Sequence, residues 1–193
     1  MPLDASRNSL VLPLLGLLVE RPSHAYGLAS LLRERYGDLS ATRSTVTSLL
    51  KSLERAGVVA SQQPERVGKR PPRTVYELTD AGMVDFRRKV EAGLGEGRTA
   101  SVDFVMAVAY TGVLSADHAA SLLEARAERL EQELAVLEER PEGVAEVHML
   151  EAAYWRTIVS AENTWVRELV SRIRSHDIDW TGVQGGEEKE DGA

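Results

Sequence analysis

The chain of 193 residues contains no cysteine. This absence excludes disulfide-stabilised scaffolds, cysteine-ligated zinc, iron–sulfur clusters and thiol catalysis. The chain also lacks a hydrophobic run that could span a bilayer, since its only membrane-like stretch, residues 10–19, is too short. Asp4 before this stretch and Pro13 within it disfavour a secretion signal. We therefore expect a buried first helix in a cytoplasmic protein that has no membrane partner.

Aromatic residues are scarce, at 5% of the chain, whereas hydrophobic residues reach 43%, which is enough for a packed core. The formal net charge of −7 disfavours nucleic-acid binding when the chain is taken as a whole. The charge is nevertheless divided unevenly. Residues 1–90 carry 14 Lys and Arg against 9 Asp and Glu, a net charge of +5, and residues 91–193 carry 9 against 21, a net charge of −12. This asymmetry indicates two parts with different partners.

Hydrophobic spacing and capping residues predict helices and two strands in the basic half of the chain. Pro13 predicts a kink or a late start in the first helix, and Ser23 is the expected cap of the second, which turns Tyr26 inward with its leucines. Ser40 or Thr42 is expected to begin the third helix. The first expected helix ends near residue 20, and the other three span about 24–36, 42–56 and 80–92. The expected strands are residues 58–61 and 74–78.

This order of elements, with a short glycine-containing turn after the second helix, is that of a winged helix-turn-helix. In such a fold the third helix enters the major groove of DNA, where short polar and cationic side chains reach the base edges. Arg43 can form two hydrogen bonds with a guanine, and the hydroxyls near it suit phosphates or bases. The candidate DNA contacts on this helix are Thr42, Arg43, Ser44, Thr45, Thr47, Ser48 and Lys51.

The loop between the two strands, residues 62–73, contains three prolines and four cations among its twelve residues. Prolines stiffen an extended arm, and cations on it suit a minor groove or a row of phosphates. We expect this loop to act as the wing, although a solvated hairpin is the alternative. The candidate DNA contacts on the wing are Arg66, Lys69, Arg70 and Arg73.

Four blocks of the basic half resemble PadR-family transcriptional regulators: residues 14–19, 22–27, 49–59 and 69–82. The resemblance covers about residues 8–90, and the remainder is similar to the long helical C-terminal region of the larger PadR subgroup. It implies a winged-helix N-terminal domain, a helical dimerisation arm and a homodimeric repressor. The chain has Ala25 and Thr47 where the family usually has glycine and tyrosine. A base contact that family members make at the tyrosine position is therefore not assigned to Thr47.

Three glycines between residues 93 and 98 indicate a domain boundary. The acidic half beyond it predicts a short helix at 101–112 and two long helices at 115–140 and 142–176. The fold class is therefore mainly α, with a two-stranded wing in the N-terminal domain. The predicted divisions are a winged-helix DNA-binding domain at 1–92, a linker at 93–100, a helical dimerisation domain at 101–180 and a disordered acidic tail at 181–193.

The two long helices carry apolar stripes, and the first of them has the alternating three- and four-residue spacing of a coiled coil. An isolated pair of such helices would expose too much apolar surface, so we expect it to associate with a second copy of the chain. Two-fold pairing would place two recognition helices about 34 Å apart and predicts a palindromic operator in double-stranded DNA. The candidate dimerisation residues are Leu123, Leu130, Leu134, Leu137, Leu150, Ile158, Trp165 and Leu169.

Aromatic residues of the acidic half either line a pocket for a small effector or form part of the dimer core. PadR-family members commonly release DNA when they bind small aromatic compounds, so the resemblance implies an effector of that kind. The candidate pocket residues are Phe104, Tyr110, Tyr154, Trp155 and Trp165. We expect no cofactor, and the four histidines lie too far apart in the sequence to predict a metal site: His24, His118, His148 and His176.

These patterns favour a homodimeric, sequence-specific DNA-binding transcriptional repressor that a small aromatic or apolar ligand releases from DNA. The alternative is a helical adaptor or scaffold that uses the winged helix to bind another protein, which the net charge of −7 and the acidic helical half would suit. An enzyme is the least favoured class. The sequence contains no paired carboxylates, no nucleophile at a suitable spacing from a base and no phosphate-binding loop.

Overall fold

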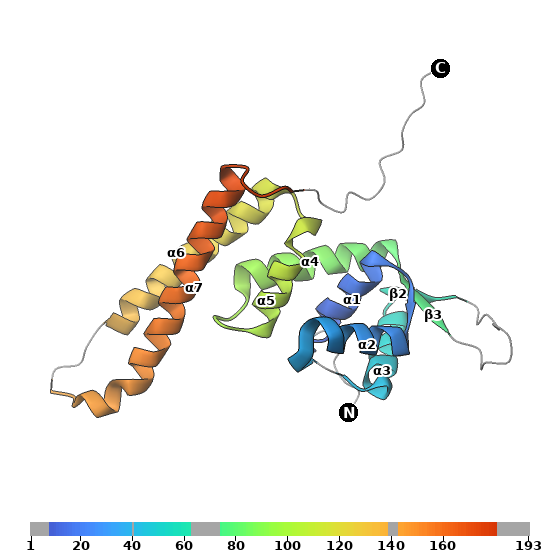
Figure 1. Cartoon of the computed structure of the whole chain (residues 1–193), viewed down its shortest axis with the longest axis horizontal. Helices are drawn as coiled ribbons and strands as arrows, with labels where there is room; N and C mark the ends of the chain where they lie inside the picture. The colour runs from blue at the N-terminus through green and yellow to red at the C-terminus, as the bar shows by residue number, and fades with distance from the viewer. Residues whose placement is uncertain (1–7, 40, 63–73, 139–142, 181–193) are drawn as a thin grey trace, which may run out of the picture. The chain divides into compact units, whose positions relative to one another are not determined.

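The computed structural model describes residues 8–39, 41–62, 74–138 and 143–180. The chain forms two units, residues 1–89 and residues 90–193, and each unit is considered by itself. Figure 1 shows the elements of both units along the chain. Within the described residues, no helix combines the length and the apolarity that crossing a membrane requires.

Three helices make up the core of the first unit: α1 (Val11–Glu20), α2 (Ala25–Tyr36) and α3 (Arg43–Arg55). Pro13 lies in the first turn of α1, where its missing N–H is not needed, and the helix starts late as the sequence predicts. The side chains that fill the core between these helices are Leu14, Leu15, Leu28, Leu32, Val46, Leu49, Leu50 and Leu53.

A three-stranded antiparallel sheet completes this unit, one strand more than the sequence predicts. The strands β1 (Ser23–His24), β2 (Val59–Ser61) and β3 (Val75–Leu78) lie in the order β1-β3-β2. The short β1 pairs with β3 through Ser23 opposite Tyr76 and His24 opposite Val75. Sequence patterning missed β1 because a two-residue strand has no alternation to detect.

The cap of α2 also differs from the expectation. The sequence predicts Ser23 as the N-cap, but His24 occupies that position, and its Nδ1 atom accepts a hydrogen bond from the Gly27 N–H at 2.9 Å. Pairing of β1 with β3 keeps both residues extended, so the helix begins one residue later than it would with Ser23 as its cap. The predicted cap of α3 is confirmed, because the Thr42 hydroxyl accepts a hydrogen bond from the Thr45 N–H at 3.2 Å.

Helix α4 (Asp80–Glu96) starts after Thr79, whose hydroxyl accepts from the Gly82 N–H, and it extends four residues beyond the predicted end at Ala92. The first residues of the predicted linker, 93–96, are therefore helical. A Cβ atom at Gly93 would lie 2.6 Å from the Cβ of Ala107, so the absent side chain allows close packing here. The glycines that predicted a break instead permit contact between helices.

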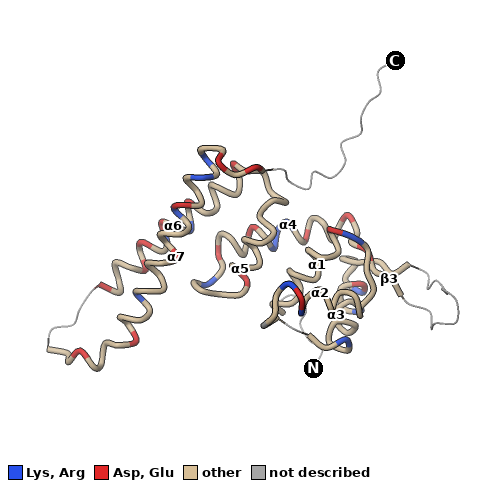
Figure 2. Tube along the Cα trace, in the orientation of Figure 1, with Lys and Arg blue, Asp and Glu red and all other residues tan. Residues whose placement is uncertain are grey.

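The second unit continues with α5 (Val102–Ala109), the 3-10 helix η3 (Thr111–Val113) and two long helices, α6 (Ala116–Glu138) and α7 (Leu150–Arg174). Helix α7 starts eight residues later than predicted, and the 3-10 helix η4 (Glu146–Met149) precedes it. Figure 1 shows α6 and α7 side by side as an antiparallel hairpin. Figure 2 shows acidic residues along α6, which has six Asp and Glu against two Arg.

The apolar seam of α6 packs against α7 within one chain. Leu123 and Leu130 are buried in the isolated chain, as are Val159 and Val166 of α7. Among the candidate dimerisation residues, Leu150 and Trp165 are exposed, with 58% and 42% of their surface accessible. The others are half-buried: Leu134, Leu137, Ile158 and Leu169. The α6 seam therefore forms the core of the hairpin itself, and α7 presents a second apolar face to solvent.

Candidate nucleic-acid interface

One face of α3 gathers the cationic and polar side chains that the sequence analysis selected. Arg43, Thr47 and Lys51 follow each other at intervals of four residues, which places them along one side of the helix. They border a cleft of about 510 Å³ in the first unit. The residues that line this cleft are His24, Ala25, Tyr26, Arg43, Thr47, Lys51, Thr74 and Tyr76.

Several hydroxyls at the start of this helix have hydrogen-bond partners within the described residues, whereas two of its cations do not. The Thr42 hydroxyl lies 2.8 Å from that of Ser44 and 2.9 Å from that of Thr45, and the Thr47 hydroxyl donates to the Arg43 carbonyl at 2.8 Å. By contrast, neither the Arg43 guanidinium nor the Lys51 ammonium forms a hydrogen bond or ion pair with the described part of the chain. Both cations are exposed, so they are available to an external anion.

The remaining candidates on α3 do not line the cleft. Thr42, Ser44, Thr45 and Ser48 lie outside its lining, although Ser44 and Ser48 are exposed. The wing candidates lie outside the described residues: Arg66, Lys69, Arg70 and Arg73. Of all the predicted DNA contacts, the structure thus brings Arg43, Thr47 and Lys51 together.

Two tyrosines extend the cleft beyond the predicted residues. Tyr26, which was expected to face inward, is 60% exposed, because Leu28 and Leu32 occupy the buried face of α2. Tyr76 on β3 is buried, and burial together with the carboxylate of Glu54 raises the pKa of its phenol. A phenol is protonated at neutral pH even at its ordinary pKa, and the raised pKa keeps the hydrogen-bond donor of Tyr76 to a higher pH.

His24 links the helix cap to the same cleft. Because its Nδ1 atom accepts the Gly27 N–H, a neutral imidazole carries its proton on Nε2. The imidazole also contacts the ring of Tyr26 edge-on, with 6.3 Å between the ring centroids. The sequence analysis selected none of His24, Tyr26, Thr74 and Tyr76 as a DNA contact. Only the pairing of β1 with β3 brings these four residues to one place.

The candidate effector-pocket residues differ in their surroundings. Trp165 borders a small hollow and contacts Phe104 edge-to-face, at 6.2 Å between ring centroids. The Trp155 indole instead donates a hydrogen bond to Glu133 at 2.7 Å, and Tyr154 is 66% exposed. Among the described residues, no group of three metal-ligating side chains is close enough to hold a metal ion.

A helix-turn-helix followed by two antiparallel strands, with a cationic face on its third helix, defines the class of winged-helix regulators. The comparison with known families agrees with this class. Residues 14–88 match the profile of the "Transcriptional regulator PadR-like family". The chain belongs to the PadR-like family of transcriptional regulators, as its resemblance in four sequence blocks predicts. No curated protein matches the chain.

Several solved structures resemble the chain. Bacillus subtilis PadR in complex with operator DNA is 19% identical over 86% of this chain and 99% of that chain, with a TM-score of 0.43. The same protein in complex with p-coumaric acid is 20% identical over 89% of this chain and 100% of that chain, with a TM-score of 0.37. A Thermoplasma acidophilum structure, described as a transcriptional regulator, is 31% identical over 44% of this chain and 79% of that chain, with a TM-score of 0.38.

Proposed function

We propose that this protein is a homodimeric repressor that binds a palindromic operator in double-stranded DNA and responds to a small ligand held by its helical half. The observation that carries the DNA-binding part is the face of α3 formed by Arg43, Thr47 and Lys51, whose two cations are exposed and unpaired within the described residues. Membership of a family of transcriptional regulators supports the same conclusion.

The residues of the cleft divide into two proposed roles. Arg43 lies in the first turn of α3, where a recognition helix contacts base edges, and its planar guanidinium suits two hydrogen bonds to a guanine. Lys51 lies two turns further along, and we assign its ammonium to a phosphate. Tyr26, which also lines the cleft and is 60% exposed, carries a hydroxyl suited to a second phosphate. Base recognition is thus assigned to Arg43, and positioning to Lys51 and Tyr26.

The proposed dimer uses the outer face of α7 rather than the seam of α6. Leu150 and Tyr154 are more than half exposed, and the neighbouring Val147 is 64% exposed. Leu150 and Tyr154 are four residues apart on α7 and therefore lie on one face of the helix, and Val147 lies in η4 directly before it. Burying this face against a second copy would remove it from water, and the two-fold axis would give two half-sites one DNA turn apart.

The decisive experiment measures binding of the full-length protein to the DNA upstream of its own gene, by fluorescence anisotropy at physiological salt. We expect a specific complex that Arg43→Ala weakens about tenfold or more, since one bidentate contact contributes about 1–3 kcal/mol of discrimination. The matched control is Arg33→Ala, an exposed cation of α2 outside the cleft lining, which should change the affinity less than about twofold. An adaptor protein would form no specific complex, and this outcome would reject the proposal.

The dimer is tested separately by sedimentation of Tyr154→Asp, which places a charge on this exposed face. We expect this variant to sediment as a monomer while its circular dichroism stays that of the native protein. A wild-type chain that is monomeric at micromolar concentration would contradict the dimer. Repression is tested with a reporter gene under the same upstream DNA, whose expression should rise when the protein is absent.

A further inference from the structure

The second unit contains a small apolar hollow at one side of the helical hairpin, with a volume of about 250 Å³. This volume is slightly below that of drug-sized ligand sites, which is about 300–1,000 Å³, so the hollow suits a ligand of one or two rings. The lining comes from α5, η3, α7 and the segment that follows α7. Its members are Val108, Thr111, Gly112, Trp165, Leu169, Ile178, Asp179 and Trp180.

Most polar groups of this lining already have partners inside the chain. The Trp180 indole donates to the Leu114 carbonyl at 2.9 Å, and the Thr111 hydroxyl donates to the Val108 carbonyl at 2.9 Å. The carboxylate of Asp179 is different, because it forms no hydrogen bond or ion pair within the described part of the chain. Among the described residues of the lining, Asp179 is also the only charged one. The hollow therefore offers one unpaired negative charge among apolar groups.

This combination selects the chemical class of the ligand. Two indole rings provide surfaces for a flat aromatic molecule, and tryptophan is the side chain that attracts cations most strongly through its ring. The Asp179 carboxylate adds attraction for positive charge and repels an anion. The net charge of −12 on residues 91–193 acts in the same direction. A small planar aromatic cation satisfies all three conditions.

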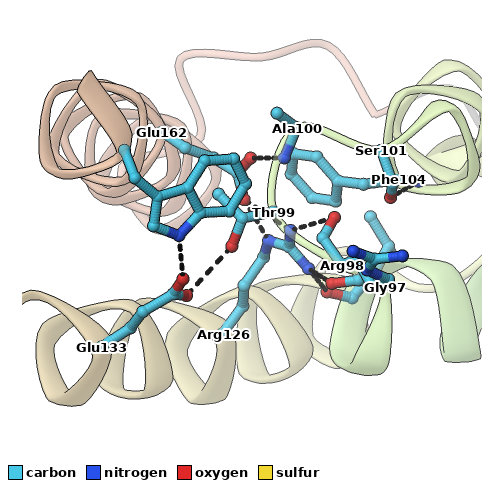
Figure 3. A network of polar contacts seen from close by, with 11 residues as sticks. Gly97, Arg98, Thr99, Ala100, Ser101, Phe104, Arg126, Glu133 and Glu162 are labelled. Atoms are coloured by element: carbon cyan, nitrogen blue, oxygen red, sulfur yellow. Dashed lines mark hydrogen bonds and ion pairs between the residues drawn. The ribbon is translucent and has the colours of Figure 1, made fainter. Parts of the chain in front are cut away.

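Trp165 connects the hollow to a buried arginine through the ring of Phe104. The Trp165 ring contacts Phe104 edge-to-face. The Arg126 guanidinium lies 3.7 Å above the Phe104 ring centroid, and Figure 3 shows these last two side chains. Arg126 is completely buried, and it donates to the carbonyls of Leu94 at 3.3 Å and Gly97 at 2.7 Å. These carbonyls lie at the C-terminal end of α4, where a helix has no intrahelical donors for them.

Glu162 completes this network from α7. Its carboxylate accepts from Arg126 at 2.9 Å and from the Ala100 N–H at 2.7 Å. The segment after α4 is thus held from two sides, through Arg126 on α6 and through Glu162 on α7 (Figure 3). A ligand that fixes the Trp165 ring would also fix Phe104 and Arg126, and it would make the bonds to the end of α4 more persistent.

We propose that the hollow beside Trp165 and Trp180 binds a small planar aromatic cation and that its occupancy stabilises the end of α4 through Phe104 and Arg126. The regulatory meaning of this site rests on the proposed DNA-binding function, because α4 begins in the unit that carries the recognition helix. The binding site itself does not depend on DNA, and it is tested without DNA.

The first test is calorimetric titration of the full-length protein at pH 8 with three probes of similar shape. N-methylquinolinium is a cation, quinoline is uncharged at this pH, and 2-naphthoate is an anion. We expect N-methylquinolinium to bind most tightly and 2-naphthoate most weakly. Equal affinities for the three probes, or no saturable binding of N-methylquinolinium, would overturn the proposal.

The charge of the site is tested by Asp179→Asn, with Asp177→Asn as its matched control. Asp177 lies outside the lining, and its carboxylate accepts the Ser175 hydroxyl at 2.6 Å. Asp179→Asn should weaken N-methylquinolinium binding about threefold to fivefold, as expected for one exposed charge pair, and should leave quinoline binding unchanged. If Asp179→Asn has no larger effect than Asp177→Asn, the assignment of the cation to this carboxylate is wrong.

The link to α4 is tested by amide hydrogen exchange of residues 97–101. This segment includes the Ala100 N–H, which donates a hydrogen bond to Glu162. N-methylquinolinium should slow this exchange about threefold or more in the wild type, with no change at the N-terminal end of α7. In Phe104→Leu the probe should bind within about twofold but the slowing should disappear. Unchanged exchange in the saturated wild type would overturn the link. A protein that passes these tests but fails to bind DNA would contradict the proposed function alone.

Discussion

Replacing Arg126 by methionine tests whether the buried arginine network holds the second unit together. The substitution removes the donors to the Leu94 and Gly97 carbonyls and leaves the Glu162 carboxylate, whose side chain is 10% exposed, without its counter-charge. Removing one partner of a buried pair costs about 3–5 kcal/mol, because the other charge stays desolvated. Since a domain is stable by about 5–15 kcal/mol, this loss should remove a large part of its stability.

The assay is urea unfolding followed by circular dichroism, with Arg167→Met as the matched control. Arg167 pairs with Glu131 across the same two helices, but both side chains are about half exposed. Exposed pairs contribute about 0–1 kcal/mol, so the control should lower the free energy of unfolding several times less than Arg126→Met does. If both variants lose less than about 1 kcal/mol, the energetic role assigned to burial is refuted.

Three further outcomes are expected. Lys69→Ala combined with Arg70→Ala should weaken binding to all DNA sequences and reduce the slope of log K against log salt by about one to two, and an unchanged slope would remove the wing from the proposed DNA contact. Gly93→Ala should destabilise the protein by about 1–3 kcal/mol, because the new Cβ atom would lie 2.6 Å from the Cβ of Ala107. In the control Gly112→Ala the new Cβ atom meets nothing within 4 Å. Equal urea midpoints of unfolding for the two variants would contradict this prediction. The hydrogen bond from Arg174 lowers the pKa of the Glu124 carboxyl. This pair therefore stabilises the fold at pH values above the ordinary glutamate pKa, and the stabilisation is lost as the pH falls. An NMR titration of the Glu124 carboxylate should show the lowered pKa.

The recognition helix could be predicted closely because its signals are local. The Thr42 cap, the apolar spacing of Val46, Leu49 and Leu53, and the glycine after the helix all lie within one stretch of chain. Gly57 has φ of +74°, as a residue that ends a helix often does. Such features act within one or two helical turns, so the sequence displays them directly.

The cleft beside this helix could be predicted only in part. Its Arg43 side follows from helical spacing, but its Tyr76 side depends on a pairing between residues more than fifty positions apart. A two-residue strand leaves no pattern in the sequence. The inward orientation expected for Tyr26 was wrong for a related reason, since the other residues of α2 already fill the available core.

The sequence by itself determined the class of the protein: the division into a basic and an acidic half, the order of elements in the winged helix, and the membership of the PadR-like family. Only the tertiary structure decided which apolar and charged groups meet. It assigned the α6 seam to the hairpin core, left the outer face of α7 to solvent and buried Arg126 against the end of α4. The physical reason is that helical periodicity specifies a face but not its partner, and burial depends on contacts between segments far apart in the chain.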